Sequence, residues 1–213
     1  MKLTTYRRKR RFDVTPEPSG KAKAAREPEQ PLIYVIQKHR ASHLHYDLRL
    51  EWGGVLLSWA VPKGPSLDPA VKRLAMQVED HPVDYATFEG VIPESEYGGG
   101  TVMLWDSGTW IPESKAVAEA LAEGDLKFTL RGKKLKGSWV LVRTRGFGRQ
   151  STRSSWLLIK HRDQFASTKD ITETEPYSVR THRLLADIAR DEGGNVTQAA
   201  TGDPTPKKRS ARA

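Results

Sequence analysis

The chain has no cysteine, which excludes disulfide bonds and thiolate metal ligands and is compatible with a reducing cytoplasm. It also has no apolar run near the roughly 20 residues that a membrane-spanning helix needs. The N-terminal sequence MKLTTYRRKRRF lacks an apolar segment after its basic cluster, so it does not resemble a secretory signal. These absences predict a cytoplasmic protein with no membrane partner.

The chain has an excess of positive charge. Its 213 residues carry a formal net charge of +9, and the pI is about 9.7. This excess favours a polyanionic partner, with nucleic acid as the first expectation, and therefore a nucleoid-associated location. Part of the charge lies in basic clusters at residues 7–11 and 207–212. Such clusters often neutralise phosphates without reading bases.

Composition divides the chain into three parts. Residues 1–30 are rich in Lys, Arg, Glu and Pro and have almost no large apolar residue after Phe12, which predicts a flexible basic N-terminal arm. Residues 31–170 carry the apolar patterning of one domain. Residues 171–213 are expected to hold a short helix within 178–192 and a disordered basic tail over about the last twenty residues.

The central part predicts many short strands separated by Gly and Pro. Residues 44–61 read as a hairpin that turns at WGG, and residues 113–124 have helical spacing and end on a glycine. Further strands are expected at 32–38, 73–79, 100–106, 126–132, 137–144 and 155–161. The pattern predicts a mostly β fold, namely a compact antiparallel β-barrel with a few short helices and disordered tails.

One predicted strand concentrates titratable groups. The segment HRASHLHYDLRLE, residues 39–51, holds three of the six histidines of the chain. Because side chains alternate along a strand, its apolar residues face the core and its polar residues share the other face. The apolar set is Leu44, Tyr46, Leu48 and Leu50, and the polar set is His43, His45, Asp47, Arg49 and Glu51. Imidazole with carboxylate is a typical ligand set for a divalent metal, whereas a solvated edge strand would not need it.

Spacing alone leaves two ligand sets open. Either His43, His45 and Asp47 hold one ion, or His39 replaces His43. Alternate residues on one face lie about 7 Å apart, so three in a row reach one ion poorly. The set with His39 is therefore favoured, with His43 beside the metal ligands or facing the substrate.

A second cluster follows in KRLAMQVEDHPVDY, residues 72–85. Arg73 and Glu79 share one strand face, His81 continues that alternation, and Tyr85 follows a turn. Arginine binds phosphate oxygens in a bidentate fork, and histidine and tyrosine can donate hydrogen bonds or protons to phosphate. If this face met that of His45 inside a barrel, the site would join a metal to several phosphate donors.

Two long motifs carry a resemblance to a known family. QKHRASHLHYDLRLEWGGVLLSWAVPKGPSLDP and RLAMQVEDHPVDYATFEGVIPESEYGGGTVMLWDSGTW closely resemble the 3′-phosphoesterase module of bacterial DNA ligase D, which also occurs as free-standing bacterial and archaeal proteins. The resemblance covers about residues 31–160, with a weaker echo in FDVTPEP. The chain shows no ligase or polymerase region, so it resembles a free-standing member or an excised module.

The resemblance implies a β-barrel with a polar concavity that holds Mn²⁺ and a phosphate, although Co²⁺ and Zn²⁺ share the same ligands. By motif match, the metal ligands are His39, His45 and Asp47. The expected catalytic residues are His81, Arg49, Tyr85 and Glu79, and the expected phosphate contacts are Arg49, Arg73, His81, Tyr85 and Lys63. The N-terminal arm is expected to contribute Glu17 to the site. Family members often carry Asp before the Phe of this arm, where this chain has Arg11, so Arg11 is left out.

The implied activity acts on 3′ ends of DNA or RNA/DNA primer–templates. A terminal ribonucleoside is removed, and the remaining 3′-phosphate is hydrolysed to the 3′-hydroxyl that a ligase or polymerase needs. A separate DNA ligase, polymerase or end-binding protein is the expected partner. His81 is the candidate general acid, because imidazole can be protonated near neutral pH.

Two other functions compete with this reading. Two histidines and a carboxylate on a barrel also form the facial triad of Fe(II) oxygenases, but the Arg, His and Tyr neighbours favour phosphate. A non-catalytic nucleic-acid-binding barrel would use the charge, with Trp105 and Trp110 as stacking groups. Such a binder would not need His39, His45 and Asp47.

Overall fold

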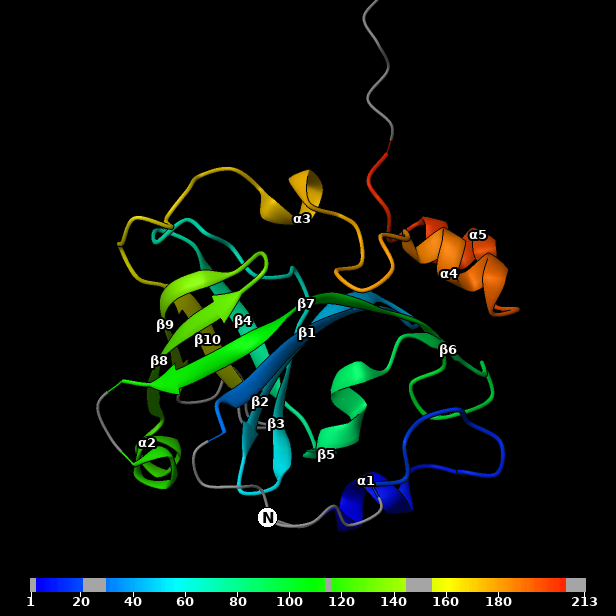
Figure 1. Ribbon diagram of the computed structural model, residues 1–213, viewed down its shortest axis with the longest axis horizontal. Helices are drawn as coiled ribbons and strands as arrows, with labels where there is room; N and C mark the ends of the chain where they lie inside the picture. The colour runs from blue at the N-terminus through cyan, green and yellow to red at the C-terminus, as the bar shows by residue number, and fades with distance from the viewer. Residues whose placement is uncertain (1–2, 21–29, 114–115, 145–154, 206–213) are drawn as a thin grey trace, which may run out of the picture.

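The computed structural model describes residues 3–20, 30–113, 116–144 and 155–205 (Figure 1). The basic cluster expected at 207–212 lies outside these ranges. Among the described residues, no helix is both long enough and apolar enough to cross a membrane.

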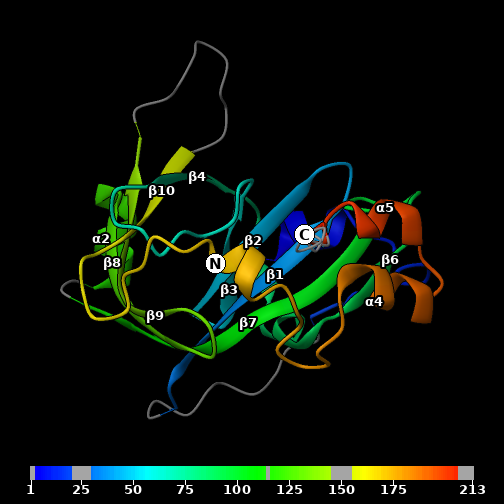
Figure 2. The same cartoon turned by 90° about the horizontal axis from the view of Figure 1, so that it is seen from above.

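Eight antiparallel strands close into a barrel in the order β1, β2, β3, β4, β10, β9, β8 and β7. The barrel closes because β7 pairs with β8 and also with β1, and Figure 2 shows it from above. The strands are β1 (Leu32–Arg40), β2 (Leu44–Trp52), β3 (Val55–Val61), β4 (Lys72–Gln77), β5 (His81–Pro82), β6 (Gly90–Ile92), β7 (Gly100–Pro112), β8 (Asp125–Gly132), β9 (Lys136–Arg143) and β10 (Ser155–Lys160). The predicted fold class is confirmed.

The inside of the barrel is filled by large apolar side chains. All eight barrel strands contribute to this cluster, which includes five tryptophans, two tyrosines and several leucines, and to which β4 adds only Ala75. The apolar face predicted for residues 44–50 belongs to it, since Tyr46, Leu48 and Leu50 are buried there. Because the core occupies the lumen, a polar site inside the barrel is excluded. The polar residues of β2 instead face outward.

Two tight connections fix the register of β1, β2 and β3. Gly53 and Gly54 form a two-residue turn with φ of 58° and 79°, values that favour glycine. The turn places Arg49 opposite Ser58 on β3. On the other side of β2, the short connection to β1 places His45 opposite His39. The hairpin expected at residues 44–61 is confirmed.

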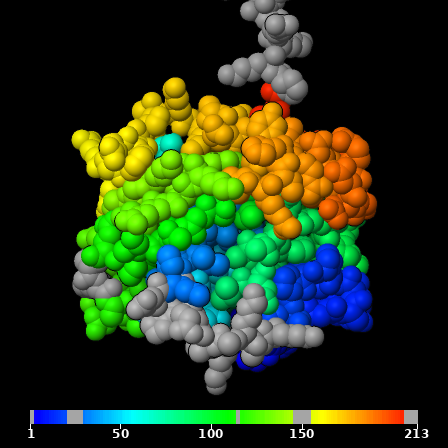
Figure 3. Space-filling model, in the orientation of Figure 1, coloured from blue at the N-terminus to red at the C-terminus, as the bar shows by residue number. Residues whose placement is uncertain are grey.

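The outer face of these strands is covered by two segments distant in sequence. One contains β5 and the 3₁₀ turn η1 (Val83–Thr87), and the other is the N-terminal segment 3–20 with helix α1 (Thr4–Arg8). Tyr6 is fully buried and its ring contacts His81 and Tyr85. In Figure 3 the two segments lie side by side on one face. The prediction of a flexible arm is therefore wrong for residues 3–20, because an aromatic anchor outweighs their polar composition.

The C-terminal segment is also more ordered than expected. It forms α3 (Ile171–Thr174), α4 (Leu185–Asp191) and α5 (Val196–Ala200), whereas α2 (Val117–Glu123) joins β7 to β8. Leu185, Ile188 and Ala199 are buried in the main core. The helix expected within 178–192 is present as α4, but residues 194–205 are not a disordered tail, because α5 packs on α4 (Figure 1).

Candidate active site

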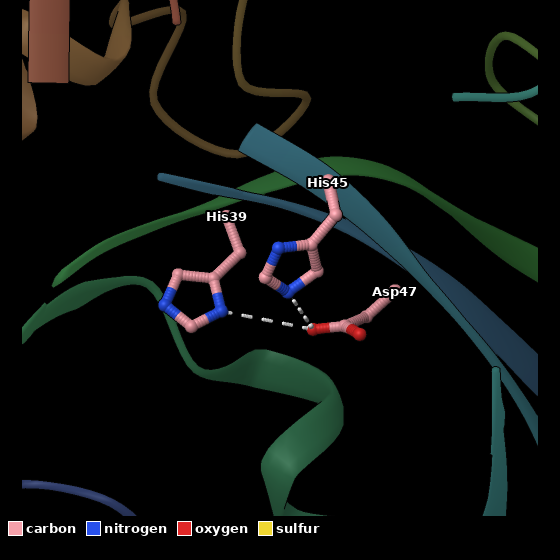
Figure 4. Close-up of side chains that lie close together, drawn as sticks. All are labelled: His39, His45 and Asp47. Carbon is pink, nitrogen blue, oxygen red and sulfur yellow. Dashed lines mark ion pairs between the residues drawn. The ribbon is translucent and has the colours of Figure 1, made fainter. Parts of the chain in front are cut away.

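The outer face of β1 and β2 brings together two histidines and an aspartate. His39, His45 and Asp47 each offer a ligand atom, and these atoms lie within 4.8 Å of one another. Asp47 Oδ2 is 3.9 Å from His39 Nδ1 and 3.7 Å from His45 Nε2 (Figure 4). The cross-strand pairing of His39 with His45 explains how residues six apart meet.

Neighbouring residues affect the hydrogen bonding of His45 and the pKa values of His39 and Asp47 in ways that suit metal binding. The Nδ1 atom of His45 lies 3.0 Å from the carbonyl oxygen of His43, to which it can donate, so Nε2 keeps its lone pair toward Asp47. Burial and the neighbouring His45 lower the pKa of His39 to about 4, so this imidazole is neutral at neutral pH. Burial acts to raise the pKa of Asp47, but Arg49 and the two histidines outweigh it and keep the carboxylate ionised.

This donor set fits a divalent metal: two imidazole nitrogens and one carboxylate oxygen lie close together. The side chain of His43 is not part of this donor set, because it is exposed. His43 contacts His45 through its backbone carbonyl oxygen. The ligand set with His39 is therefore the one whose atoms the fold brings together.

Arg49 lies beside this cluster and is almost completely buried. Its guanidinium donates to Gln37 Oε1 at 2.7 Å, to Ser58 Oγ at 2.9 Å and to Asp47 Oδ2 at 3.1 Å. Gln37 is in turn fixed by donating to the carbonyl oxygens of Tyr85 and Phe88. These bonds use three of the five N–H donors of Arg49 within the described chain, and the other two can serve a ligand.

His81 and Tyr85 continue the site away from the metal ligands. His81 Nδ1 lies 2.9 Å from the carbonyl oxygen of Glu79, and its Nε2 lies 3.2 Å from Arg10 Nη2. Burial, Arg49 and Arg10 lower the pKa of His81 well below its usual value. The neutral ring therefore donates through Nδ1 and accepts from Arg10 through Nε2. Tyr85, whose pKa is raised mainly by burial, donates its hydroxyl to Glu17 Oε1 at 3.0 Å.

The arm supplies a residue that sequence reasoning missed. The side chain of Arg10 is only 6% exposed and is paired with Glu17 at 2.8 Å and with Glu79 at 3.3 Å. Its guanidinium lies 3.9 Å from the centre of the Tyr6 ring. Arg10 was counted among the basic residues of a flexible cluster, and its aromatic partner four residues earlier was the available signal.

Glu17 and Glu79 lie where the sequence placed them, next to the site. Glu17 is buried and accepts from Arg10 and Tyr85. Glu79 is half-buried and accepts from Arg10 and from Lys9 Nζ, the latter at 3.0 Å. Burial acts to raise the pKa of Glu79, but its hydrogen bonds and Lys9 lower it overall. Each carboxylate therefore orders a cation or a hydroxyl around the site.

Two predicted phosphate contacts are not brought to this cluster. Paired residues share a face of a sheet, and Asp47 pairs with Ala60, which pairs with Met76. Arg73 has the opposite alternation to Met76 and shares the face of Ala75, which is buried in the barrel core. Lys63 is exposed on the loop after β3. Within the described chain, neither cation bonds to a member of the cluster.

The tryptophans considered as stacking groups are part of the core. Trp105 and Trp110 are at most 1% exposed. Their indole nitrogens donate to the carbonyl oxygens of Glu175 and Glu51. Neither ring can stack on a nucleobase, which removes one of the two observations that favoured a pure binding module; the positive charge is the other.

Fold and site together define a class of protein: an antiparallel β-barrel that carries a two-histidine, one-carboxylate centre beside buried guanidinium groups. A model of the DNA ligase D 3′-phosphoesterase domain matches residues 37–143, and the chain belongs to this family.

Similar proteins agree with this assignment. The chain is 52% identical over 186 residues to the multifunctional non-homologous end joining protein LigD of Pseudomonas aeruginosa, covering 86% of this chain and 22% of that protein. The protein of the same name from Mycolicibacterium smegmatis is 42% identical over 173 residues, covering 76% and 21%. A DNA repair LigD of Mycobacterium tuberculosis is 45% identical over 145 residues, covering 68% and 19%. The chain thus spans about a fifth of the length of these relatives.

Proposed function

We propose that the protein is a metal-dependent phosphoesterase that repairs the 3′ ends of DNA in non-homologous end joining. It removes a terminal ribonucleoside to leave a 3′-phosphate, and then hydrolyses this phosphate to a 3′-hydroxyl. A DNA ligase or polymerase, in the same polypeptide or another, needs that product. Family membership supports the chemistry, and the names of the relatives support the repair process.

One observation carries the proposal: buried guanidinium groups stand next to a set of metal ligands. Arg49 bonds to the candidate ligand Asp47, and Arg10 contacts His81, whose ring packs against Tyr85. Arginine suits phosphate oxygens because its planar guanidinium can donate two parallel hydrogen bonds to them.

The charges of the site suit a metal bound together with a phosphate. Arg10, Arg49 and Lys9 are matched in the described chain by three carboxylates, those of Glu17, Glu79 and Asp47. A divalent cation alone or a phosphate dianion alone would upset this match in a buried place. The two together leave the net charge unchanged, so each favours the binding of the other.

We assign the metal to His39, His45 and Asp47, where Mn²⁺ is the proposed ion and Co²⁺ or Zn²⁺ can be held by the same ligands. When bound, it supplies a Lewis acid for a phosphate oxygen. Arg49 offers its remaining N–H groups to the oxygens on which negative charge grows. The Tyr85 hydroxyl donates to Glu17 in the free protein, and we propose that it turns to donate to the phosphate when one binds.

His81 has a different role in the free protein from that expected of a general acid. Its neutral ring accepts from Arg10 through Nε2, so it has no proton to give at that atom. We propose that a bound phosphate takes over the Arg10 donor, and that its negative charge stabilises a proton on Nε2. His81 would then donate to the leaving oxygen, with Glu79 holding the ring through its carbonyl group.

The experiment follows a primer–template whose primer ends in one ribonucleoside, incubated with Mn²⁺, and resolves both products by gel electrophoresis. The wild type is expected to produce first a 3′-phosphate end and then a 3′-hydroxyl end. Asp47→Asn preserves shape but removes the ligand charge, and should lose both products. If the wild type leaves the primer intact with every divalent metal while binding it tightly, the proposal fails.

A further inference from the structure

An exposed tyrosine stands at the edge of the candidate active site. Tyr97 lies on the loop between β6 and β7 and is 46% exposed. The next residue, Gly98, lies against the metal-ligand candidate His39, since a Cβ at Gly98 would be 3.8 Å from the Cε1 atom of that ring. Tyr97 is therefore one residue away from a direct neighbour of the metal centre.

The same ring also borders the guanidinium part of the site. The guanidinium carbon of Arg10 is 5.6 Å from the centre of the Tyr97 ring, and Arg10 itself contacts His81. Lys9 Nζ is 4.4 Å from the ring centre and donates to the hydroxyl at 3.0 Å. The ring thus contacts cations of the candidate site, and its backbone neighbour Gly98 lies against a candidate metal ligand.

Tyr97 is held in place although it is exposed. Its loop has two internal backbone hydrogen bonds, from Glu96 to Pro93 and from Gly99 to Glu96. The neighbouring Glu96 also pairs with Arg11 of the N-terminal segment. A fixed aromatic ring loses little conformational entropy when a flat group stacks on it.

We propose that Tyr97 is a stacking platform for a nucleobase that flanks the phosphate in the active site. The inference rests on the proposed function and adds a residue that positions the nucleic-acid strand. The groups assigned so far bind a metal or a phosphate. Every substrate carries the phosphate, so these groups do not contact the flanking nucleobase. Stacking on an aromatic ring tolerates any base, as an enzyme that processes arbitrary DNA ends requires.

The test measures binding without turnover. Fluorescence anisotropy in EDTA gives the Kd of full-length protein for labelled primer–templates that carry a normal 3′ end, an abasic terminal nucleotide or an abasic penultimate nucleotide. Base–aromatic stacking predicts that one of the two abasic substitutions weakens wild-type binding at least about fivefold. Tyr97→Ala should weaken binding of the normal primer to the same extent, with no further loss on that abasic primer.

Two variants serve as controls. Tyr97→Phe keeps the ring and should keep wild-type affinity. Tyr177→Ala removes a similarly exposed tyrosine, at 49%, beside the β8–β9 hairpin and should have no effect. The platform is refuted if neither abasic primer binds more weakly than the normal one, or if Tyr97→Ala loses affinity equally on all three primers.

Hydrolysis in Mn²⁺ separates this inference from the proposed function. If the base-dependent affinity is present but no primer is hydrolysed, the platform stands and the phosphoesterase proposal falls. If the wild type hydrolyses the primers but affinity does not depend on Tyr97 and a flanking base, the phosphoesterase proposal stands and the stacking platform is refuted. When both hold, Tyr97→Ala should raise KM for the normal primer at least about fivefold, with kcat nearly unchanged.

Discussion

The planar guanidinium of Arg49 donates hydrogen bonds to a candidate metal ligand and to two side chains of the neighbouring barrel strands. Through one of these side chains it is linked to a covering segment. Its three acceptors lie on three different residues, and Gln37 links it to the backbone of the segment that contains η1. Lysine could not reproduce this arrangement, because its ammonium group is one compact nitrogen on a flexible chain, whereas the guanidinium has three nitrogens in a rigid plane. The shape of the guanidinium matters here as well as its charge.

Arg49→Lys should therefore fold but hydrolyse a 3′-phosphate primer at least about 100-fold more slowly, the loss typical of removing one group that stabilises transition-state charge. Steady-state kinetics, with circular dichroism to verify folding, measure this. Lys127→Arg, an exposed change on β8, should leave the rate unaltered. A rate for Arg49→Lys within a few-fold of wild type would show that charge alone suffices.

At the same scale, the sequence predicts which side chains gather at the candidate site in some cases and not in others, for a physical reason. His45, Asp47 and Arg49 were predictable because alternation along one strand fixes their common face. Arg10 was missed because the carboxylates and the imidazole that it contacts, those of Glu17, Glu79 and His81, are 7 to 71 positions away. Arg73 was assigned by motif, but the pairing of β4 turns it to the core face.

At the level of elements, the strands were predictable and the coverings were not. Strand alternation and glycine turns are local signals, so the eight barrel strands appear near their expected ranges, although β7 runs on to Pro112 and the short β5 and β6 were not expected. The N-terminal segment has few apolar residues, yet Tyr6 enters a second apolar cluster with Leu56 and Phe88. Its hydroxyl donates to the Pro18 carbonyl oxygen at 2.6 Å, which closes the segment on itself. One buried aromatic ring thus orders a polar stretch.

Tyr6→Ala should release this segment, because it removes the ring on which Arg10 stacks and which contacts His81. Limited trypsin digestion should cleave after the exposed Arg8 or Arg11 faster than in the wild type, and hydrolysis should fall at least about tenfold as Arg10 and Glu17 lose their positions. Tyr6→Phe keeps the ring and loses one hydrogen bond worth about 1 kcal/mol. Equal protease resistance of Tyr6→Ala and wild type would contradict an anchoring role.

For the whole molecule, the barrel serves as a rigid wall and the site lies on its outside. Large aromatic side chains fill the lumen, so the lumen can hold no substrate. The candidate site instead lies between the outer face of β1, β2 and β3 and the covering segments, one of which carries the exposed Arg7 and Arg8 on α1. We expect these two arginines to meet the phosphates of a bound duplex. The net charge of +9 is a property of the whole chain, and we expect it to attract a polyanion such as DNA.

Affinity for a primer–template should therefore fall steeply with salt, because binding releases counterions from the phosphates. Between about 50 and 200 mM salt the Kd should rise at least about tenfold. Arg8→Ala should reduce the slope of log Kd against log salt by about one, whereas Lys127→Ala on β8 should not. A Kd that is flat over this range would contradict an electrostatic footprint on the DNA backbone.

The most direct test of the central claim compares two histidines four residues apart. Metal-free wild type, His39→Ala and His43→Ala are titrated with Mn²⁺, and conversion of a 3′-phosphate primer–template to a 3′-hydroxyl end is measured at each concentration. The account predicts that His43→Ala follows the wild-type curve, because only its backbone oxygen contacts His45, and that His39→Ala gives no product at any Mn²⁺ concentration that saturates the wild type. Full activity of His39→Ala, or loss of activity in His43→Ala alone, would contradict it.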